Sequence, residues 1–176
     1  RAGGDTIDGG TGTDTASYAN ATAGIIVSLV TGIGTLGEAL GDTLISIENL
    51  TGSAYDDTLT GDATANVITG GNGNDTITDG AGADTINAGI GNDIIYAGDG
   101  GDTIDGGTGT DRLAFEQVTS AVTVNLQTGV GSLGYAAGDT YSSIEELVGS
   151  TAADTLTAAD AGSSINGYWG NDTIVG

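Results

Sequence analysis

The chain contains no proline, cysteine, methionine or histidine, and Arg1 and Arg112 are its only basic residues. Without histidine, cysteine or lysine it has no ordinary acyl-transfer triad, so we do not expect this segment to be an enzyme. The absence of cysteine excludes disulfides and removes the ligands that softer metals prefer. Because positive charge is so scarce, there is no electrostatic footprint for nucleic acid or anionic lipid, and we expect neither as a partner.

Long hydrophobic runs are also missing. The longest apolar stretch, at residues 24–30, is too short to span a bilayer, so we expect no membrane insertion. No signal peptide is visible at the N-terminus. The chain starts inside one sequence repeat and stops where another would begin, which indicates a part of a longer array.

Glycine and acidic residues are abundant instead. The 176 residues include 34 glycines and 24 acidic residues, and the formal net charge is −22. So much negative charge repels itself in a compact state, and so much glycine makes the backbone costly to order. A metal-free globular core is therefore hard to justify, whereas cations bound among the carboxylates would change the balance.

Five nonapeptides follow one another without insertion over residues 70–114: GGNGNDTIT, DGAGADTIN, AGIGNDIIY, AGDGGDTID and GGTGTDRLA. Each follows G-G-x-G-x-D-x-U-x, where U is a large aliphatic residue, the calcium-binding repeat of parallel β-helices. The aspartate slot holds Asp75, Asp84, Asp93, Asp102 and Asp111. The aliphatic slot, which we expect to form the core, holds Ile77, Ile86, Ile95, Ile104 and Leu113.

A longer repeat surrounds these nonapeptides. Residues 13–60 align without gaps with residues 110–157 at a constant offset of 97, which pairs Asp14 with Asp111 and Glu48 with Glu145. The nonapeptide pattern lapses once in each copy of this longer repeat, so we expect one β module to be used twice. In its first copy, residues 24–32 are expected to form a strand, which a glycine-rich turn follows. The nonapeptide phase then resumes, with Glu48 in the aspartate slot and Leu50 in the aliphatic slot.

The sequence therefore predicts an all-β fold: a right-handed parallel β-roll, or β-helix solenoid, of nonapeptide repeats interrupted by two homologous inserted β modules. The expected segments are repeats at 1–17, an inserted module at 18–51, a central roll at 52–114, a second module at 115–148 and C-terminal repeats at 149–176.

The nine-residue spacing predicts where the carboxylates meet. A glycine turn and a short strand reverse the chain, so two nonapeptides make one coil and successive coils stack about 4.8 Å apart. Alternate repeats then form two ladders: Asp57, Asp75, Asp93 and Asp111 on one side, and Glu48, Asn66, Asp84 and Asp102 on the other. Carboxylates this close repel one another unless a cation lies between them, and Ca²⁺ suits an oxygen-only, flexible site of high coordination number.

These motifs resemble the RTX family of secreted bacterial proteins, whose nonapeptide arrays form a parallel β-roll with Ca²⁺ between successive turns. In that family the aspartate carboxylate and the carbonyls of the glycine turn bind the metal. The resemblance implies aspartate ligands at Asp5, Asp14, Asp57, Asp75, Asp84, Asp93, Asp102, Asp111, Asp154 and Asp172. It implies turn ligands at Gly9, Gly10, Gly12, Gly70, Gly71, Gly73, Gly80, Gly82, Gly89, Gly91, Gly98, Gly100, Gly106, Gly107, Gly109, Gly167 and Gly170.

Four positions depart from the aspartate slot. Asn66 and Ser163 lack the carboxylate, whereas Glu48 and Glu145 are longer carboxylates that can substitute for it. The central run predicts sites that pair Asp57 with Asp75, Asp75 with Asp93, Asp93 with Asp111, Asn66 with Asp84, and Asp84 with Asp102. We therefore expect several Ca²⁺ ions, about five or more.

The leading hypothesis is a calcium-binding β-roll module of a bacterial protein, and the resemblance implies type I secretion. The chain would stay unfolded in the calcium-poor cytosol and fold outside the cell or at its surface. One alternative is a structural or adhesive repeat region of a surface layer, filament or biofilm protein, which self-associates or contacts other repeats. Another is an accessory module of a secreted protease, lipase or epimerase.

Overall fold

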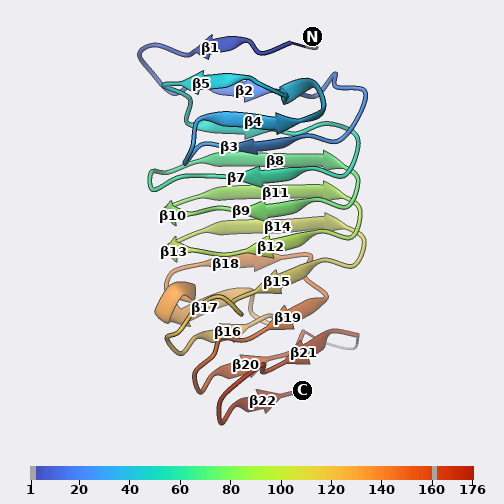
Figure 1. Cartoon of the computed structure of the whole chain (residues 1–176). Helices are drawn as coiled ribbons and strands as arrows, with labels where there is room; N and C mark the ends of the chain where they lie inside the picture. The colour runs from blue at the N-terminus through green and yellow to red at the C-terminus, as the bar shows by residue number, and fades with distance from the viewer. Residues whose placement is uncertain (1–2, 160–161) are drawn as a thin grey trace.

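The computed structural model describes residues 3–159 and 162–176, and Arg1, Ala2, Asp160 and Ala161 lie outside the described part. Short strands wind into a long roll that runs from β1 (Thr6–Asp8) at one end to β22 (Thr173–Val175) at the other (Figure 1). Within the described ranges, the helical elements are two 3₁₀ turns, η1 (Gly37–Ala39) and η2 (Gly134–Ala136). The expected all-β roll is therefore confirmed.

Two long sheets form the roll. The first is ordered β1, β5 (Thr43–Ile45), β4 (Ile33–Leu36), β3 (Ile26–Ser28), β7 (Thr58–Thr60), β9 (Thr76–Thr78), β12 (Ile94–Tyr96), β15 (Arg112–Ala114), β19 (Glu146–Val148), β21 (Ser164–Asn166). The second is ordered β2 (Thr15–Ser17), β6 (Asn49–Thr51), β8 (Val67–Asn72), β11 (Thr85–Ile90), β14 (Thr103–Thr108), β18 (Thr140–Ser142), β17 (Val130–Leu133), β16 (Thr123–Asn125), β20 (Thr155–Thr157), β22. A small ribbon pairs β10 (Ala81–Gly82) with β13 (Asp99–Gly100).

Parallel pairing in the central block follows the eighteen-residue coil. Ile77 pairs with Ile95 in the first sheet, and Ile68 pairs with Ile86 in the second. Consecutive nonapeptides thus lie in opposite sheets, and alternate ones stack directly on one another. This confirms the expected arrangement of two repeats per coil.

The core is a double column of aliphatic side chains between the two sheets. Side chains alternate faces along a strand, so the residue two positions after each aspartate points inward. All five aliphatic residues of the central repeats are at most 1 % exposed, as is Phe115 at the start of the second module. The core is one residue deep from each sheet, and the hydrophobic contribution per coil is correspondingly small.

The two segments that interrupt the repeats each add a hairpin to one sheet. In residues 18–51, β4 runs antiparallel to both β3 and β5, while β3 and β5 pair in parallel with β7 and β1. The strand predicted at 24–32 is longer than the observed one, because β3 ends at Ser28. The next strand, β4, begins at Ile33, where a glycine-rich turn is predicted. The chain reverses around Gly32, whose φ of +63° suits a residue without a Cβ.

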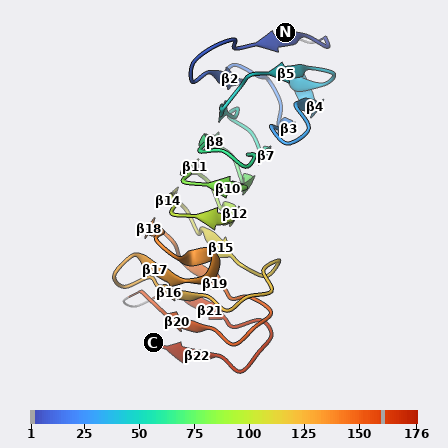
Figure 2. The same cartoon turned by 90° about the vertical axis from the view of Figure 1, so that its left-hand side faces the viewer.

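The two hairpins lie in opposite sheets. The strands β3, β4 and β5 of the first module belong to the first sheet, whereas β16, β17 and β18 of the second module belong to the second sheet. In Figure 2, β3 and β4 lie at the right-hand edge and β16 and β17 at the left. Each nonapeptide carries the chain from one sheet to the other. Seven nonapeptides, at 52–114, separate the two modules, and because seven is an odd number the second module starts from the opposite sheet.

Candidate metal centre

One ladder of carboxylates runs along the turns beside the first sheet. The backbone N–H of Asp57 donates to Oδ1 of Asp75 at 2.8 Å, and Asp75 donates in the same way to Asp93. Asp93 donates to Oδ1 of Asp111 at 2.9 Å, and the N–H of Asp111 donates to Oε2 of Glu145. All four aspartates are at most 3 % exposed.

A second ladder follows the turns on the other side. Asn66 N–H donates to Oδ1 of Asp84 at 2.7 Å, Asp84 to Asp102 at 2.8 Å, and Asp102 to Asp139 at 2.9 Å. We call each side chain of a ladder a rung. The predicted rung at Glu48, on the N-terminal side of Asn66, differs from the others. Its own carboxylate accepts from Asp14 N–H, and its carbonyl accepts from the Asn66 side-chain amide at 2.7 Å.

In most rungs the second carboxylate oxygen has no partner. The Oδ2 atoms of Asp14, Asp75, Asp84, Asp93, Asp102 and Asp111 are buried and accept no hydrogen bond from any described residue. A buried, unpartnered oxygen costs free energy and calls for an explanation such as an ion. The donors are hard, anionic oxygens stacked beside glycine turns, and that set fits Ca²⁺.

Burial also changes the acidity of these groups. Desolvation raises the pKa of Asp75 to about 7, and the neighbouring carboxylates of Asp57 and Asp93 add to the effect. Desolvation likewise raises the pKa of Asp84 and Asp111 to about 6, and it raises the pKa of Asp93 and Asp102. The ladders therefore need a neutralising partner at neutral pH, which is either a proton or a cation.

The glycine turns hold the coils close together. Of the predicted turn residues, those with positive φ are Gly10, Gly12, Gly71, Gly73, Gly80, Gly82, Gly89, Gly91, Gly107, Gly109 and Gly170. The remaining predicted turn residues, which keep negative or extended φ, are Gly9, Gly70, Gly98, Gly100, Gly106 and Gly167. At Gly89, φ is +117° and a Cβ would collide with the carbonyl oxygen of Gly71 in the coil before it. Larger residues there would push the coils apart.

Two predicted aspartate ligands have both carboxylate oxygens occupied. Ser53 donates to Asp57 from its backbone N–H and from its hydroxyl, the latter at 2.8 Å. Ser150 does the same to Asp154, also at 2.8 Å from its hydroxyl. The signal is in the sequence, because a serine replaces the second glycine of the turn in each case.

The predicted ligands near the ends of the chain are less enclosed. Asp5 is exposed, and its N–H donates to Oδ1 of Asp42 at 2.8 Å. Asp14 and Asp172 are half-buried, and Oδ1 of Asp172 accepts from Asp154 N–H at 3.0 Å. Ser163 donates its hydroxyl to the carbonyl of Ala159.

In each module a tyrosine hydroxyl donates to the Oδ2 atom of the equivalent ladder aspartate, which is Asp42 in the first module and Asp139 in the second. The Tyr18 hydroxyl donates to Oδ2 of Asp42 at 3.0 Å, and the Tyr141 hydroxyl donates to Oδ2 of Asp139 at 2.7 Å. Burial and these carboxylates raise the pKa of both tyrosines, so both remain donors. The sequence did not reveal these contacts, because the tyrosines occupy different places in the two modules.

Asp79 is a buried carboxylate that the sequence interpretation missed. One carboxylate oxygen each of Asp79, Asp84 and Asp102 lie within 4.8 Å of one another. Desolvation, with the charge of Asp102 next in size, raises the pKa of Asp79 to about 8. The available signal was an aspartate in the first glycine slot of the turn.

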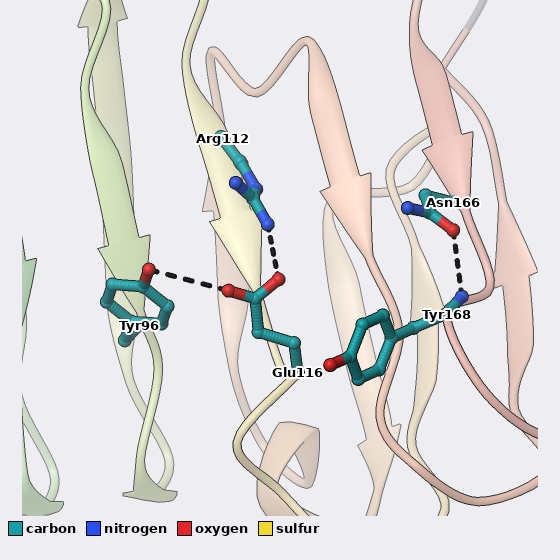
Figure 3. Close-up of polar contacts among 5 residues, drawn as sticks. All are labelled: Tyr96, Arg112, Glu116, Asn166 and Tyr168. Atoms are coloured by element: carbon teal, nitrogen blue, oxygen red, sulfur yellow. Dashed lines mark hydrogen bonds and ion pairs between the residues drawn. The ribbon is translucent and has the colours of Figure 1, made fainter.

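The basic residue next to the ladder does not neutralise it. Arg112 follows Asp111 directly, but its guanidinium pairs with Glu116, which also accepts from the Tyr96 hydroxyl at 3.5 Å (Figure 3). Nearby, the Tyr168 N–H donates to the Asn166 side chain, so this face of the roll has its own polar contacts (Figure 3). The ladder charge is left for another partner.

Comparison with known families agrees with this geometry. The family model of the RTX calcium-binding nonapeptide repeat matches in four copies, at residues 1–16, 46–77, 78–113 and 146–176, which together cover more than half of the chain. A comparison with curated proteins returned no match. No helix in residues 3–159 and 162–176 is long and apolar enough to cross a membrane.

Proposed function

Because this chain belongs to the family of the RTX calcium-binding nonapeptide repeat, we propose that it is a calcium-dependent folding module of an exported bacterial protein. The observation that carries the proposal is the pair of buried ladders in which the Oδ2 atoms of Asp75, Asp84, Asp93, Asp102 and Asp111 accept no hydrogen bond from any described residue. Such ladders hold like charges together in the folded state, and bound cations relieve that repulsion.

Three pairs of neighbouring rungs have an open Oδ2 on both members: Asp75 with Asp93, Asp93 with Asp111, and Asp84 with Asp102. We assign a Ca²⁺ site to each. The sites expected at Asp57 with Asp75 and at Asn66 with Asp84 have one open carboxylate each, since Ser53 occupies Asp57 and Asn66 carries an amide. These two are proposed as weaker sites.

The energetic consequence is large for so thin a core. An ion held at about a hundred times its dissociation constant stabilises the fold by about 2.7 kcal/mol. Three such ions contribute about 8 kcal/mol. This is as large as the entire net stability of many ordinary domains, which is about 5–15 kcal/mol. In this proposal the chain stays unfolded at cytosolic calcium levels and folds after type I secretion, at the cell surface or in the medium.

Far-UV circular dichroism of the chain in excess chelator and in millimolar Ca²⁺ tests the proposal. We expect a disordered spectrum in chelator, and a β spectrum that appears cooperatively as Ca²⁺ is added. The variant Asp93→Asn, which alters two sites, should shift the midpoint to higher calcium, whereas Asp8→Asn, at an exposed aspartate of β1, should not. A β-rich spectrum that persists in chelator at about pH 8 would sink the proposal.

A second candidate role is structural, in which calcium stiffens a scaffold that contacts its neighbours. Both modules expose apolar side chains at equivalent positions: Ile33 and Val130 are each 45 % exposed, and Leu36 and Leu133 are about half exposed. Matching apolar patches on a repeated module favour association with further repeats. Calcium-dependent light scattering that falls in the double variant Leu36→Ser and Leu133→Ser would support this role, and a monomer at all calcium concentrations would argue against it.

A further inference from the structure

Asp79 occupies a turn position that is otherwise small throughout the central roll. The equivalent residues of the other turns are Gly52, Gly61, Gly70, Ala88, Ala97 and Gly106. Asp79 therefore brings a carboxylate to a place where the other repeats have almost no side chain. It follows β9 directly, and its Oδ1 accepts from Gly98 N–H in the next coil at 2.6 Å.

The geometry of the other turns shows where a side chain at this position points. A Cβ built at Gly70 would run into Oδ2 of Asp75, and one at Gly52 would meet Oδ2 of Asp57. The position therefore faces the ladder carboxylate of its own turn. In the turn of Asp79, that carboxylate belongs to Asp84, and Asp102 lies on the next rung.

All three carboxylates are enclosed and each has an open oxygen. Asp79 is fully buried, and Asp84 and Asp102 are 2 % and 1 % exposed. Their Oδ2 atoms accept no hydrogen bond from the described residues, and one oxygen of each carboxylate lies within 4.8 Å of the other two. Among the described residues, this is the one group of three acidic side chains that meets this condition.

Building on the proposed function, we propose that Asp79, Asp84 and Asp102 form a three-carboxylate cation site that binds Ca²⁺ more tightly than the other rungs. Affinity of oxygen-ligand sites rises with the number of anionic ligands, so the third carboxylate sets this site apart. A trivalent lanthanide of similar size balances three carboxylates and is the ligand that this site favours most strongly. As calcium rises, this rung fills first.

The test is a calorimetric Ca²⁺ titration of the full chain, repeated with Tb³⁺ and read by luminescence. Asp79→Asn keeps an acceptor for Gly98 N–H, and Asp79→Gly restores the residue that the repeat pattern expects. Both should weaken the tightest ion by about tenfold or more and leave the weaker ions unchanged. Asp8→Asn, which removes an equal charge at an exposed position in β1, away from this site, should leave the tightest ion unchanged.

Equal affinities for the tightest ion in all four proteins would overturn the site. A titration in which the unaltered chain binds no calcium would instead overturn the proposed function, so the two failures are distinguishable. Asp79→Gly keeps the repeat pattern and should fold in saturating calcium. If circular dichroism shows the same β spectrum for it while its first ion is weakened, the site is supported independently of stability.

Discussion

Each aspartate in a ladder uses its two carboxylate oxygens differently. Oδ1 accepts the backbone N–H of the neighbouring rung, as Asp93 does for Asp75 at 2.8 Å, while Oδ2 is left open. Asp57 departs from this pattern, because its Oδ2 accepts the backbone N–H of Ser53 and its Oδ1 accepts the Ser53 hydroxyl at 2.8 Å. The hydroxyl contact is the one that a glycine in the second slot of the turn could not make.

Replacing Ser53 by alanine should destabilise the calcium-loaded chain by about 1–3 kcal/mol, because the buried Asp57 carboxylate loses a donor. Denaturant unfolding in saturating Ca²⁺ measures the effect. Ser17→Ala, at an exposed serine of β2, is the matched control and should change the free energy of unfolding very little. Equal losses in the two variants would contradict the assignment of Ser53.

The sequence located most of these residues because the aspartate slot has a fixed phase. The aspartate slot alone does not distinguish Asp57 from Asp75, and only Ser53 in the second glycine slot marks the difference between them. The difference lies in whether Oδ2 has a nearby donor, which depends on the turn adopting its folded shape. Asp79 was missed for a similar reason, as its proximity to Asp102 arises only when coils stack.

At the scale of the element, the two modules provide a tyrosine hydroxyl to the same ladder carboxylate from two different positions. Under the 97-residue offset, Tyr18 aligns with Phe115 and Leu44 aligns with Tyr141. In each module one tyrosine reaches the rung carboxylate, Asp42 or Asp139, and an apolar side chain fills the other place. The tyrosine and the apolar residue have therefore changed places between the two modules, while the hydrogen bond from tyrosine to the aspartate is present in both.

Tyr141→Leu should therefore cost about 1–3 kcal/mol, because the buried Asp139 carboxylate loses its hydroxyl donor. Adding Phe115→Tyr recreates the arrangement of the first module and should recover most of the loss. Thermal unfolding of the single and double variants in calcium measures both effects. Tyr135→Phe, at a more exposed tyrosine in η2, is the control. No recovery in the double variant would mean that the two modules are not interchangeable at this rung.

The hairpins themselves were only partly predictable. The β-branched residues and flanking glycines marked the place of β3 but not its length, and they do not specify which strand a segment pairs with. The antiparallel return through β4 is set by tertiary pairing with β5. Which sheet receives the hairpin, in contrast, follows from counting the nonapeptides between the two modules.

At the scale of the whole molecule, the net charge of −22 opposes a fold that stacks carboxylates. Burial raises the pKa of Asp75 to about 7, of Asp79 to about 8 and of Asp111 to about 6. In the metal-free state the folded chain thus holds protons that the unfolded chain releases. Its free energy of unfolding falls as pH rises from the ordinary aspartate value of 3.8 toward about 8.

In chelator, lowering the pH from about 8 to about 5 should therefore increase the β signal in far-UV circular dichroism. With calcium present the trend should reverse in part, because protons compete with Ca²⁺ for the same oxygens and weaken its binding. Calcium titrations at the two pH values check the second effect. A metal-free chain that is more folded at pH 8 than at pH 5 would contradict the role of the buried carboxylates.

The bonds along each ladder give the roll a polarity. Every rung donates its N–H to the carboxylate that follows it in the chain, from Asp57 through Asp75 and Asp93 to Asp111. Cutting the stack between any two coils would leave amide donors on one face and carboxylate acceptors on the other. Two such faces match only head to tail, and the loss of one aspartate frees the amide of the coil before it while the coil after it stays bound. The ladder is therefore directional, and the loss of one aspartate disturbs the coil on its N-terminal side.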